Sequence, residues 1–532
     1  MSFPGGDTAP HTASHTTSEP APAAAGAASP VRTVLRPGAV ITQADWAADR
    51  EVRSLHVICI GGAGMSAVAR LALEAGYTVS GSDPLEGQFI APLREAGAQI
   101  HIGFDANAMP ADVDLVVVST AVRPDNPEVQ RAQAEGIPVV HRAAVLAGLL
   151  REHTLLAVAG THGKTSTTAM AAMALRGAGE DPAWAVGAAV PDLGRNAGFG
   201  AVAMGKRADG AGTSALAVVE ADESDGSFLA FHPRALVVTN QEPDHLDFHG
   251  DAATLQAAFD ALVDQLAPGG TLVVCADDPG AAALGARCNR DDVSVATYGT
   301  GHGCTWQIVA EEPAADGTTA QLNTPQGPLT LQLAVGGHHN VLNAVGALAA
   351  AHAVLPQAPL AALGEGVSRF HGASRRFDVA GTVQGVTVVD DYAHHPREVE
   401  ATILAARGIA QARGGRVLAV FQPHLFSRTR DFAAEFAQAL STADRSWVMP
   451  VYAAREDPDP SVSAHTITSQ AGPGRTLIAL EDRTEVPQVV AETAQMGDLV
   501  LMLGAGDIVE DTPAVLAALE GADIPAEREN AS

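Results

Sequence analysis

The sequence is short of cysteine, and the few cysteines it has form no pattern. They stand at positions 59, 275, 288 and 304, without the paired spacing of a zinc site or the density of a disulfide framework. Scattered thiols are typical of a reducing compartment. We therefore expect a cytoplasmic protein with no zinc site.

Basic residues and long apolar runs are also scarce. Lys and Arg total 32 against 61 Asp and Glu, a formal net charge of −29. Such a charge makes nucleic acid or an anionic membrane an unfavourable partner, so anionic ligands must be held by local groups. No run approaches the roughly 18 apolar residues of a membrane span, and the N-terminus lacks the order of a signal peptide. We expect neither nucleic acid nor a membrane among the partners.

The length is sufficient for several packed domains. At about 150 residues per domain the chain predicts three to four domains, and 47% hydrophobic residues are ample for their cores. Residues 1–35 are rich in Ala, Pro, Thr, Gly and Ser without periodicity, which predicts a disordered tail. From residue 54 onward, short apolar runs alternate with helical patterns, as expected of an α/β protein with parallel sheets.

The most informative stretch is residues 154–168. An apolar run ends at Gly160, and Gly163-Lys164-Thr165 then opens a helical pattern. This order is typical of a phosphate-binding loop, because a buried strand fixes the loop, glycines let backbone N–H groups approach phosphates, and the helix N-terminus adds positive charge. Lys164 would supply a full charge and Thr165 a hydroxyl for Mg²⁺.

This loop is shorter than the usual pattern, since Val158 stands where its first glycine is expected. The alternative interpretation is a strand-to-helix turn that carries Gly-Lys-Thr by chance. The apolar run before the loop and the helical pattern after it favour phosphate binding.

A second glycine-rich turn follows the apolar run at 55–60. It reads Cys59-x-Gly61-x-x-Gly64, so cysteine replaces the first glycine of the dinucleotide fingerprint, and Asp83 follows at about the spacing of a ribose-binding carboxylate. On these residues alone an NAD-dependent oxidoreductase stays open. Another diphosphate-bearing nucleotide is favoured, because a phosphate-binding loop follows in the next unit.

Two acidic clusters follow predicted strands beside the phosphate-binding loop. The strand at 215–219 leads into 220–225, and the strand at 235–239 leads into 240–247. Ligand sites in open α/β sheets lie at such strand ends, and carboxylates there would hold Mg²⁺. The alternative is a pair of solvated loops on an acidic protein. His245 by itself would more often be a hydrogen-bonded loop histidine.

The rest of the chain predicts β-hairpins at 300–333, an Ala-rich helix that His339 and Asn340 open, and a third α/β unit from about residue 372. His339 and Asn340 could be simple helix caps.

In the third unit, the predicted strands at 386–389 and 417–421 are expected to be neighbours. Tyr392 and His394 follow the first strand and Arg428 follows the second. Arg and His at strand ends suit phosphate or carboxylate binding, and a solvated basic rim is the alternative.

Taken together, these motifs resemble those of the Mur ligase family of peptidoglycan synthesis. The resemblance is collinear from about residue 54 to residue 510, and its motifs are highly specific in combination. They are GGAGMS at 61–66, GTHGKT at 160–165, EADESD at 220–225, DHLD at 244–247, HN at 339–340, RRF at 375–377, DYAHHP at 391–396 and QPH at 422–424.

The resemblance implies three α/β domains. They are an N-terminal Rossmann-like domain for a UDP sugar at 36–152, a central P-loop ATPase with a mostly parallel sheet at 153–371, and a C-terminal Rossmann-like domain at 372–532 that closes over the amino acid and ATP. The implied reaction joins L-alanine to the carboxylate of UDP-N-acetylmuramate through an acyl phosphate, with ATP as substrate and Mg²⁺ as cofactor. A cytoplasmic monomer or homodimer is expected.

The resemblance also implies roles for residues by position. Lys164, His245, Arg376 and His394 would be catalytic, and Thr165, Glu220 and His245 would bind Mg²⁺. Contacts with ATP would come from Gly160, Thr161, His162, Gly163, Lys164, Thr165, Ser166, Asn340 and Asp391. The UDP sugar would lie against Gly61, Gly62, Ala63, Gly64, Met65, Asp83, Asp222 and Ser224, and the amino acid against Tyr392, His394 and Arg428.

The sequence departs from the family pattern at two positions. Cys59 replaces a glycine beside the expected UDP diphosphate, and Leu425 stands where many relatives carry arginine near the amino-acid carboxylate. With Leu425 uncharged, Arg428 becomes the expected anchor of that carboxylate.

Three other functions stay open at this point: a Mur ligase that adds a peptide or another amino acid, an NAD-dependent oxidoreductase, and a non-catalytic nucleotide switch.

Overall fold

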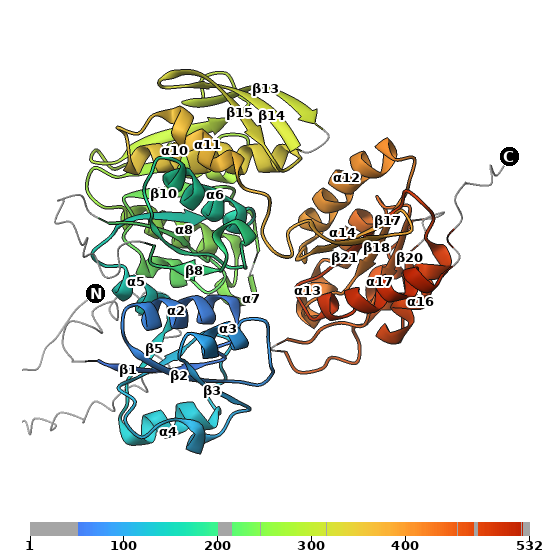
Figure 1. Cartoon of the computed structure of the whole chain (residues 1–532), viewed down its shortest axis with the longest axis horizontal. Coiled ribbons are helices and arrows are strands. Elements are labelled where there is room, and N and C mark those ends of the chain that lie inside the picture. Colours follow the sequence, from blue (N-terminus) through green and yellow to red (C-terminus); the bar gives the residue numbers. More distant parts are fainter. Residues whose placement is uncertain are drawn as a thin grey trace, which may run out of the picture.

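The computed structural model describes residues 52–200, 215–244, 246–314, 317–454, 456–472, 477–522 and 524. Its strands form three sheets, one in each of three α/β domains (Figure 1), which confirms the predicted fold class. The predicted disordered tail at 1–35 and His245 lie outside the described residues. The domain boundaries proposed above stay predictions.

The N-terminal domain is a five-stranded parallel sheet in the order β3-β2-β1-β4-β5. The order reverses between β1 and β4, which creates the crevice at the strand ends where such sheets bind ligands. Its elements are β1 Ser54–Ile58, α2 Ala63–Glu74, β2 Thr78–Asp83, α3 Ile90–Glu95, β3 Gln99–Ile102, β4 Leu115–Val118, α4 Pro127–Glu135, β5 Val139–His141 and α5 Arg142–Leu149.

The central domain has a ten-stranded sheet in the order β15-β14-β13-β12-β11-β10-β6-β9-β7-β8. Its middle is parallel, and the predicted hairpins form the antiparallel β13, β14 and β15 at one edge. Its strands are β6 Thr154–Ala159, β7 Ala183–Ala185, β8 Ala197–Gly198, β9 Leu216–Glu220, β10 Ala235–Val238, β11 Thr271–Cys275, β12 Ser294–Gly299, β13 Trp306–Ala314, β14 Gly317–Thr324 and β15 Gly327–Leu333. Its helices are α6 Lys164–Gly177, α7 Leu246–His249, α8 Ala252–Asp264, α9 Pro279–Arg287, α10 His338–Val354 and α11 Leu360–Ser368.

The C-terminal domain has a six-stranded sheet in the order β16-β17-β21-β18-β19-β20, in which only β16 is antiparallel to its neighbour. The expectation that the strands before Tyr392 and Arg428 are neighbours is wrong, because β21 lies between β17 and β18. Its elements are β16 Asp378–Val383, β17 Val386–Asp391, α12 Pro396–Ala412, β18 Val417–Phe421, α13 Phe426–Asp431, α14 Ala433–Leu440, β19 Arg445–Val448, α15 Ala464–Thr468, β20 Leu477–Ala479, α16 Val486–Thr493, β21 Leu499–Leu503 and α17 Thr512–Gly521.

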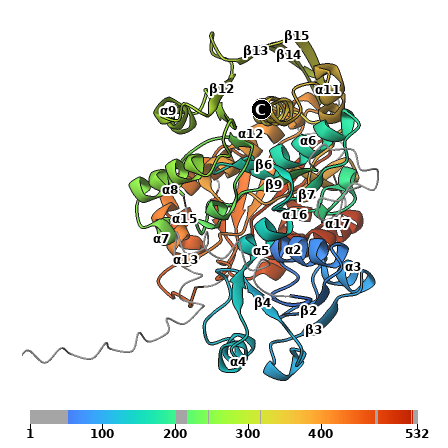
Figure 2. The ribbon, with the colours of Figure 1, turned by 90° about the vertical axis from the view of Figure 1, so that its left-hand side faces the viewer.

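The apolar cores show which domains are joined firmly. One continuous cluster of buried residues runs from Leu55 in the N-terminal domain to Ala373 at the end of the central domain. The C-terminal domain has separate clusters on the two faces of its sheet, as the alternation of Val388 and Val389 on β17 shows. Figure 1 shows the N-terminal domain against the central domain through α2 and α5, with the C-terminal domain to one side; in Figure 2 the C-terminal domain lies behind them. The C-terminal domain is therefore the part whose position depends on polar contacts.

Within the part of the chain that the structure describes, no helix is both long and apolar enough to cross a bilayer.

Candidate active site

The phosphate-binding loop between β6 and α6 depends on two glycines with positive φ. Gly160 has φ 129° and Gly163 has φ 80°. A Cβ on Gly160 would overlap the Thr239 hydroxyl, and one on Gly163 would overlap the Asn343 amide. Only glycine fits both the backbone conformation and the space. Val158 is fully buried inside β6, so the loop is short because the strand continues past the position where longer loops begin.

Lys164 is the charged group of this loop. Its ammonium donates to the carbonyl oxygens of Gly160 at 2.8 Å and Thr161 at 3.1 Å, and it lies 2.8 Å from Glu223 Oε2. Burial by itself would lower the pKa of Lys164, but the carboxylates of Glu223, Asp222 and Glu220 outweigh burial and raise it. A charged ammonium therefore stays in place at neutral pH, as stabilisation of a transferring phosphoryl group requires.

Thr165 and Glu220 meet at the start of α6 and the end of β9. The Thr165 hydroxyl donates to Glu220 Oε1 at 3.1 Å, and the backbone N–H of Gly187 donates to Oε2 at 2.6 Å. A hydroxyl and a carboxylate beside a phosphate-binding loop are the hard oxygen ligands that Mg²⁺ takes. The two predicted metal ligands that the structure describes are thus adjacent, and the third, His245, lies outside the described residues.

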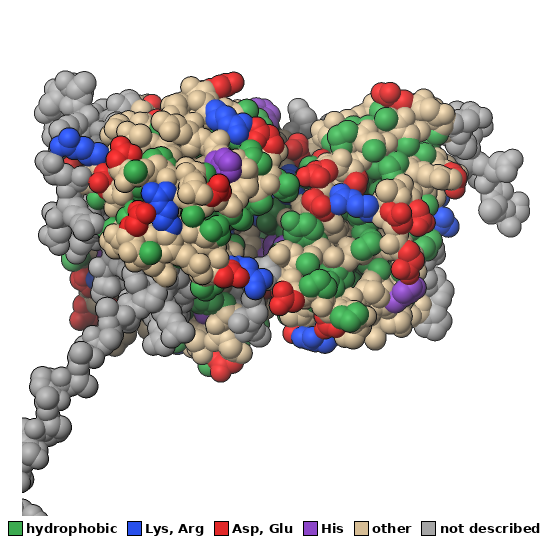
Figure 3. All heavy atoms as spheres, turned by 90° about the horizontal axis from the view of Figure 1, so that it is seen from below, with side chains coloured by type: hydrophobic (Ala, Val, Ile, Leu, Met, Phe, Trp, Pro, Cys, Tyr) green, Lys and Arg blue, Asp and Glu red, His purple; other side chains and the backbone are tan. Residues whose placement is uncertain are grey.

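A cavity of about 320 Å³ lies between the central and C-terminal domains. Figure 3, seen from below, shows a hollow between the C-terminal domain and the rest of the protein. Six residues predicted to contact ATP line the cavity: His162, Gly163, Thr165, Ser166 and Asn340 on the central domain, and Asp391 on β17. The sequence reasoning missed Tyr298, Phe370 and Phe377, which also line it and supply flat apolar faces suited to a nucleobase.

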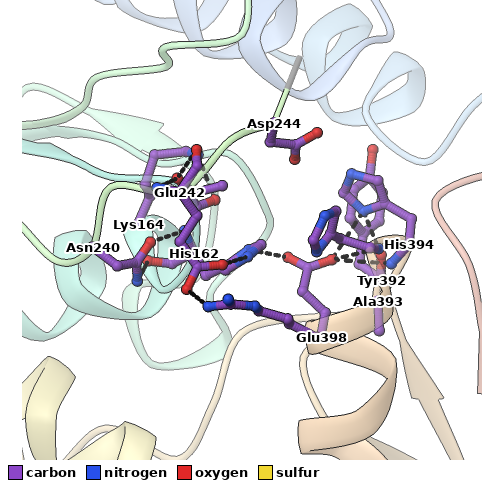
Figure 4. Close-up of polar contacts among 12 residues, drawn as sticks. His162, Lys164, Asn240, Glu242, Asp244, Tyr392, Ala393, His394 and Glu398 are labelled. Atoms are coloured by element: carbon purple, nitrogen blue, oxygen red, sulfur yellow. Dashed lines mark hydrogen bonds and ion pairs between the residues drawn. The ribbon is translucent and has the colours of Figure 1, made fainter. Parts of the chain in front are cut away.

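A charged network links the two walls of this cavity. His162 Nδ1 lies 3.0 Å from Glu398 Oε1 on α12, and its Nε2 lies 3.5 Å from Glu242 Oε2 (Figure 4). Arg397 on α12 forms an ion pair with the same Glu242. Burial would lower the pKa of His162, but hydrogen bonds to Glu242 and Glu398 raise it to about 9. The sequence did not identify three residues of this network, Glu398, Glu242 and Arg397, because no local spacing shows that α12 contacts the central domain.

The C-terminal wall is built around the loop after β17. Asp391 accepts from the backbone N–H groups of Phe377 at 2.7 Å and Ala393 at 2.8 Å, and burial raises its pKa to about 6. The guanidinium carbon of Arg376 lies 5.3 Å from the Tyr392 ring centroid, so two of the predicted site residues stack. His394 is partly buried, and desolvation lowers its pKa to about 4, so its imidazole is neutral at pH 7.

Arg428 is not among the residues that line the cavity, and it is paired with a carboxylate of the central domain. Its Nη2 donates to Asp244 Oδ1 at 2.9 Å, and both side chains are buried. This ion pair joins α13 to the loop after β10, and therefore joins the C-terminal domain to the central domain. Leu425, at the position where arginine was expected, is buried with φ 71° at the start of α13.

The N-terminal glycine turn is held by Asp83. The backbone N–H of Gly61 donates to Asp83 Oδ2 at 2.8 Å, and that of Leu85 donates to Oδ1 at 3.2 Å. Cys59 has φ 60°, in the left-handed region, where the dinucleotide fingerprint has a glycine. No side chain caps α2, so the N–H groups of its first turn, which includes Ala63, Gly64 and Met65 after Gly62, can face an anion.

Asp222 and Ser224 lie at the junction of the N-terminal and central domains. Asp222 accepts from the Ser224 hydroxyl at 2.9 Å and from Arg142 at 3.1 Å. Next to them, His141 Nε2 lies 3.3 Å from Asp225 Oδ2. The sequence analysis did not predict His141 and Arg142 as site residues. They lie at the end of β5, and a position at a strand end is the signal that identified the acidic clusters.

The fold and this site define a three-domain α/β protein with a phosphate-binding loop at a cavity between two domains and a second glycine turn in its N-terminal domain. Comparison with known families agrees. Residues 54–154 match the model described as "Mur ligase family, catalytic domain", 158–351 match "Mur ligase middle domain", and 375–506 match "Mur ligase, glutamate ligase domain". The chain belongs to the Mur ligase family.

Curated relatives resemble it along nearly their whole length. The UDP-N-acetylmuramate–L-alanine ligase of Renibacterium salmoninarum is 46% identical over 471 residues, which cover 87% of this chain and 96% of the relative. The ligase of the same name from Mycobacterium marinum is 44% identical over 481 residues, covering 88% and 95%. The crystal structure of a UDP-N-acetylmuramate–alanine ligase from Thermotoga maritima has 29% identity and a TM-score of 0.72, covering 88% of this chain and 99% of that one.

Proposed function

We propose that the protein is an ATP-dependent ligase that joins L-alanine to the carboxylate of UDP-N-acetylmuramate in peptidoglycan precursor synthesis. Relatives carrying that activity in their names match almost end to end. The observation that carries the proposal is the position of Lys164 and its phosphate-binding loop between the other two domains. Asp222, which Arg142 of the N-terminal domain contacts, is near enough to Lys164 to raise its pKa. Glu398 of the C-terminal domain contacts His162 of the loop. A phosphoryl group can there be transferred between substrates held by different domains.

The reaction proceeds in two balanced steps. A carboxylate oxygen of the muramate attacks the γ-phosphorus of ATP, and ADP leaves. The neutral alanine amine then attacks the acyl carbon, the nitrogen loses a proton as phosphate leaves, and an amide bond remains. Both steps bring anionic groups together, so charge neutralisation and positioning supply most of the catalysis.

The chain offers a group for each requirement. Lys164 would stabilise the transferring phosphoryl group, with Arg376 and His394 on the opposite wall. Mg²⁺ would be held by Thr165 and Glu220, together with His245, and would neutralise charge on the phosphates. Asn340 and Asp391 would contact the nucleoside.

The other substrate sites follow the domain plan. The turn at 61–65 would hold the UDP diphosphate, with Asp83 fixing the turn, and Asp222 with Ser224 would face the sugar. Tyr392, His394 and Arg428 would face the amino acid. We further propose boundaries at 36–152, 153–371 and 372–532, a cytoplasmic location, and a monomer or homodimer that needs no nucleic acid or membrane.

The proposal is tested by phosphate release from ATP in the presence of UDP-N-acetylmuramate and one acceptor at a time: L-alanine, L-serine, glycine, D-glutamate or a tripeptide. We expect release with L-alanine and a product whose mass equals the muramate plus alanine minus water. Release with the tripeptide instead would make the protein a peptide-adding ligase. ATP binding without release under any condition would favour a nucleotide switch.

A further inference from the structure

A polar network buried in the N-terminal domain carries a further inference, which rests on the proposed function. It consists of His56 on β1, Ser80 and Ser82 on β2, and Glu128 in the first turn of α4. The exposed fractions of these four residues lie between 0% and 5%. Figures 1 and 2 show α4 and α2 on opposite faces of the sheet, so the network lies on the face away from α2.

The Glu128 carboxylate is the centre of this network. Its Oε2 accepts from the Ser82 hydroxyl at 2.5 Å and lies 3.3 Å from His56 Nε2. Its Oε1 accepts from the backbone N–H of Asp105 at 3.2 Å. His56 Nδ1 in turn lies 2.9 Å from Ser80 Oγ. A single side chain therefore joins α4 to β1, to β2 and to the loop after β3.

A serine, a histidine and a carboxylate in a row are also the parts of a nucleophilic triad. Here Ser80 is 5% exposed and His56 is 1% exposed, so the serine oxygen is shielded from any acyl substrate. The network is therefore not a second catalytic centre.

Apolar side chains would be the more stabilising choice at these positions. Ile58, Val116, Val118 and Val129 form an apolar cluster on the same side of the sheet. A buried carboxylate costs desolvation free energy, which its hydrogen bonds offset only when all of them are made. Such a network fixes a geometry, because displacing any member leaves a buried polar group without its partner.

The geometry that is fixed here belongs to the N-terminal glycine turn. Consecutive strand residues point to opposite faces of a sheet, so Ser82 faces Glu128 while Asp83 faces the turn. There Asp83 accepts from the backbone N–H of Gly61 at 2.8 Å. The carbonyl oxygen of Ser82 also accepts from the N–H of Ile60 at 3.0 Å. Ser82 is thus linked to the turn through its own backbone and through its neighbour in the strand.

We propose that Glu128 is a positioning residue for the UDP sugar and acts through Ser82. Glu128 holds Ser82 from the far face of the sheet, and Ser82 with Asp83 holds the glycine turn. The turn then presents its N–H groups and the start of α2 to the diphosphate. Glu128 itself does not touch the ligand.

The test uses Ser82→Ala and Ser80→Ala as matched variants. Both remove a buried hydroxyl from the same face of β2, but Ser82 contacts Glu128 whereas Ser80 contacts His56. Calorimetric titration of the full chain with UDP-N-acetylmuramate measures the affinity, and thermal unfolding measures the stability of each variant.

We expect Ser82→Ala to weaken the binding of UDP-N-acetylmuramate at least about threefold, because the turn is less well positioned. Glu128→Gln removes the charge of the hydrogen-bond acceptor and should weaken it at least about fivefold. Ser80→Ala should change the affinity less than about twofold, and the KM values for ATP and L-alanine should stay within about twofold in all three variants.

A network that only stabilises the fold gives a different result, since affinity would then fall in step with the unfolding midpoint and the two serine variants would be alike. Equal losses of affinity in Ser82→Ala and Ser80→Ala, or an unchanged affinity in Ser82→Ala, would overturn the proposal. If Glu128→Gln does not fold, the two serine variants decide. Failure of the proposed function is seen separately, as a wild-type protein that binds the UDP sugar but forms no amide, whereas a wild type that binds no UDP sugar would overturn both.

Discussion

His162 Nδ1 lies 3.0 Å from Glu398 Oε1, and this contact joins the phosphate-binding loop to the first turn of α12 across the boundary between two domains. Glu398 also accepts from the backbone N–H groups of His394 at 3.0 Å and His395 at 3.2 Å. One carboxylate therefore caps the helix, orients the histidine-bearing loop and holds the loop that binds phosphate. Docking of the C-terminal domain and assembly of the site are the same event.

This contact predicts a dependence of stability on pH. The pKa of His162 is raised from 6.5 to about 9 in the folded protein. Its stabilising contribution is therefore complete below about pH 6.5 and is lost as the pH rises through about 9. The effect is at most about 3.5 kcal/mol, at about 1.4 kcal/mol per unit of pKa.

The measurement is the thermal unfolding midpoint between pH 6 and pH 10. The midpoint of the wild type should fall as the pH rises. This fall should be smaller in His162→Gln and unchanged in His465→Gln, whose exposed pair with Glu481 serves as control. Parallel curves for wild type and His162→Gln would contradict the assignment.

Lys164→Ala should abolish turnover and leave the UDP sugar bound by the N-terminal domain. Losing a positioned charge on the transferring phosphoryl group costs several kcal/mol of transition-state stabilisation, on the order of 100-fold or more in rate. The fold should survive, because burial raises the pKa of Glu223 even beside Lys164, and without the ammonium, which lowers that pKa, the carboxyl takes up a proton. The rate of phosphate release and the affinity for the UDP sugar check this, with Arg430→Ala as an exposed control. More than about a tenth of the wild-type rate, a loss below roughly 1.4 kcal/mol, would show that Lys164 does not stabilise the reaction.

Glu220→Ala should raise the Mg²⁺ concentration needed for half-maximal rate by at least tenfold. The remaining Thr165 hydroxyl is a weak neutral ligand, whereas the carboxylate supplies charge. A Mg²⁺ titration of the variant is compared with that of Asp181→Asn, an acidic residue in an exposed pair with Arg176. Superimposable titrations of wild type and Glu220→Ala would make this carboxylate a structural group that only holds Gly187 and Thr165.

Arg428→Lys should raise the KM for L-alanine at least tenfold, about 1.4 kcal/mol. An ammonium is a point charge and cannot reproduce the planar, forked hydrogen bonds of a guanidinium that serves two carboxylates. The KM values for ATP and the UDP sugar should change little, and Arg430→Lys, with an exposed side chain, should change none. An equal rise in the KM for ATP would mean that Arg428 serves the nucleotide or the fold.

Cys59→Gly should relieve backbone strain in the N-terminal turn. A cysteine at φ 60° occupies the left-handed region, which costs an L-residue roughly 1–2 kcal/mol, and glycine loses part of that gain to the entropy of the unfolded chain. Cys59→Ala keeps the strain and removes the thiol. The free energy of unfolding of the Gly variant should exceed that of the Ala variant by about 0.5–1 kcal/mol, and a less stable Gly variant would show that the turn is unstrained.

Short stretches of the sequence determined many of the strands and part of the candidate site. The apolar runs gave the strands β1, β6, β9, β10, β17, β18 and β21 close to their observed positions, because a strand of a parallel sheet is buried on both faces and needs a continuous apolar run. The phosphate-binding loop, Thr165 and Glu220 followed from residue types at strand ends, since helix N-termini and glycine turns act over a few residues.

The tertiary structure alone decided what meets across the domains. No spacing in the sequence places Glu398 on His162 or Asp244 on Arg428, because those pairs are 236 and 184 residues apart and depend on how the C-terminal domain docks. Strand order is also decided by the tertiary structure: β21 lies between β17 and β18 although it follows β18 in the chain by some 80 residues. Electrostatic and packing contacts between distant segments depend on how the whole chain packs. The packed structure places the Asp83 carboxylate on the backbone of its own glycine turn and pairs Arg428 with Asp244.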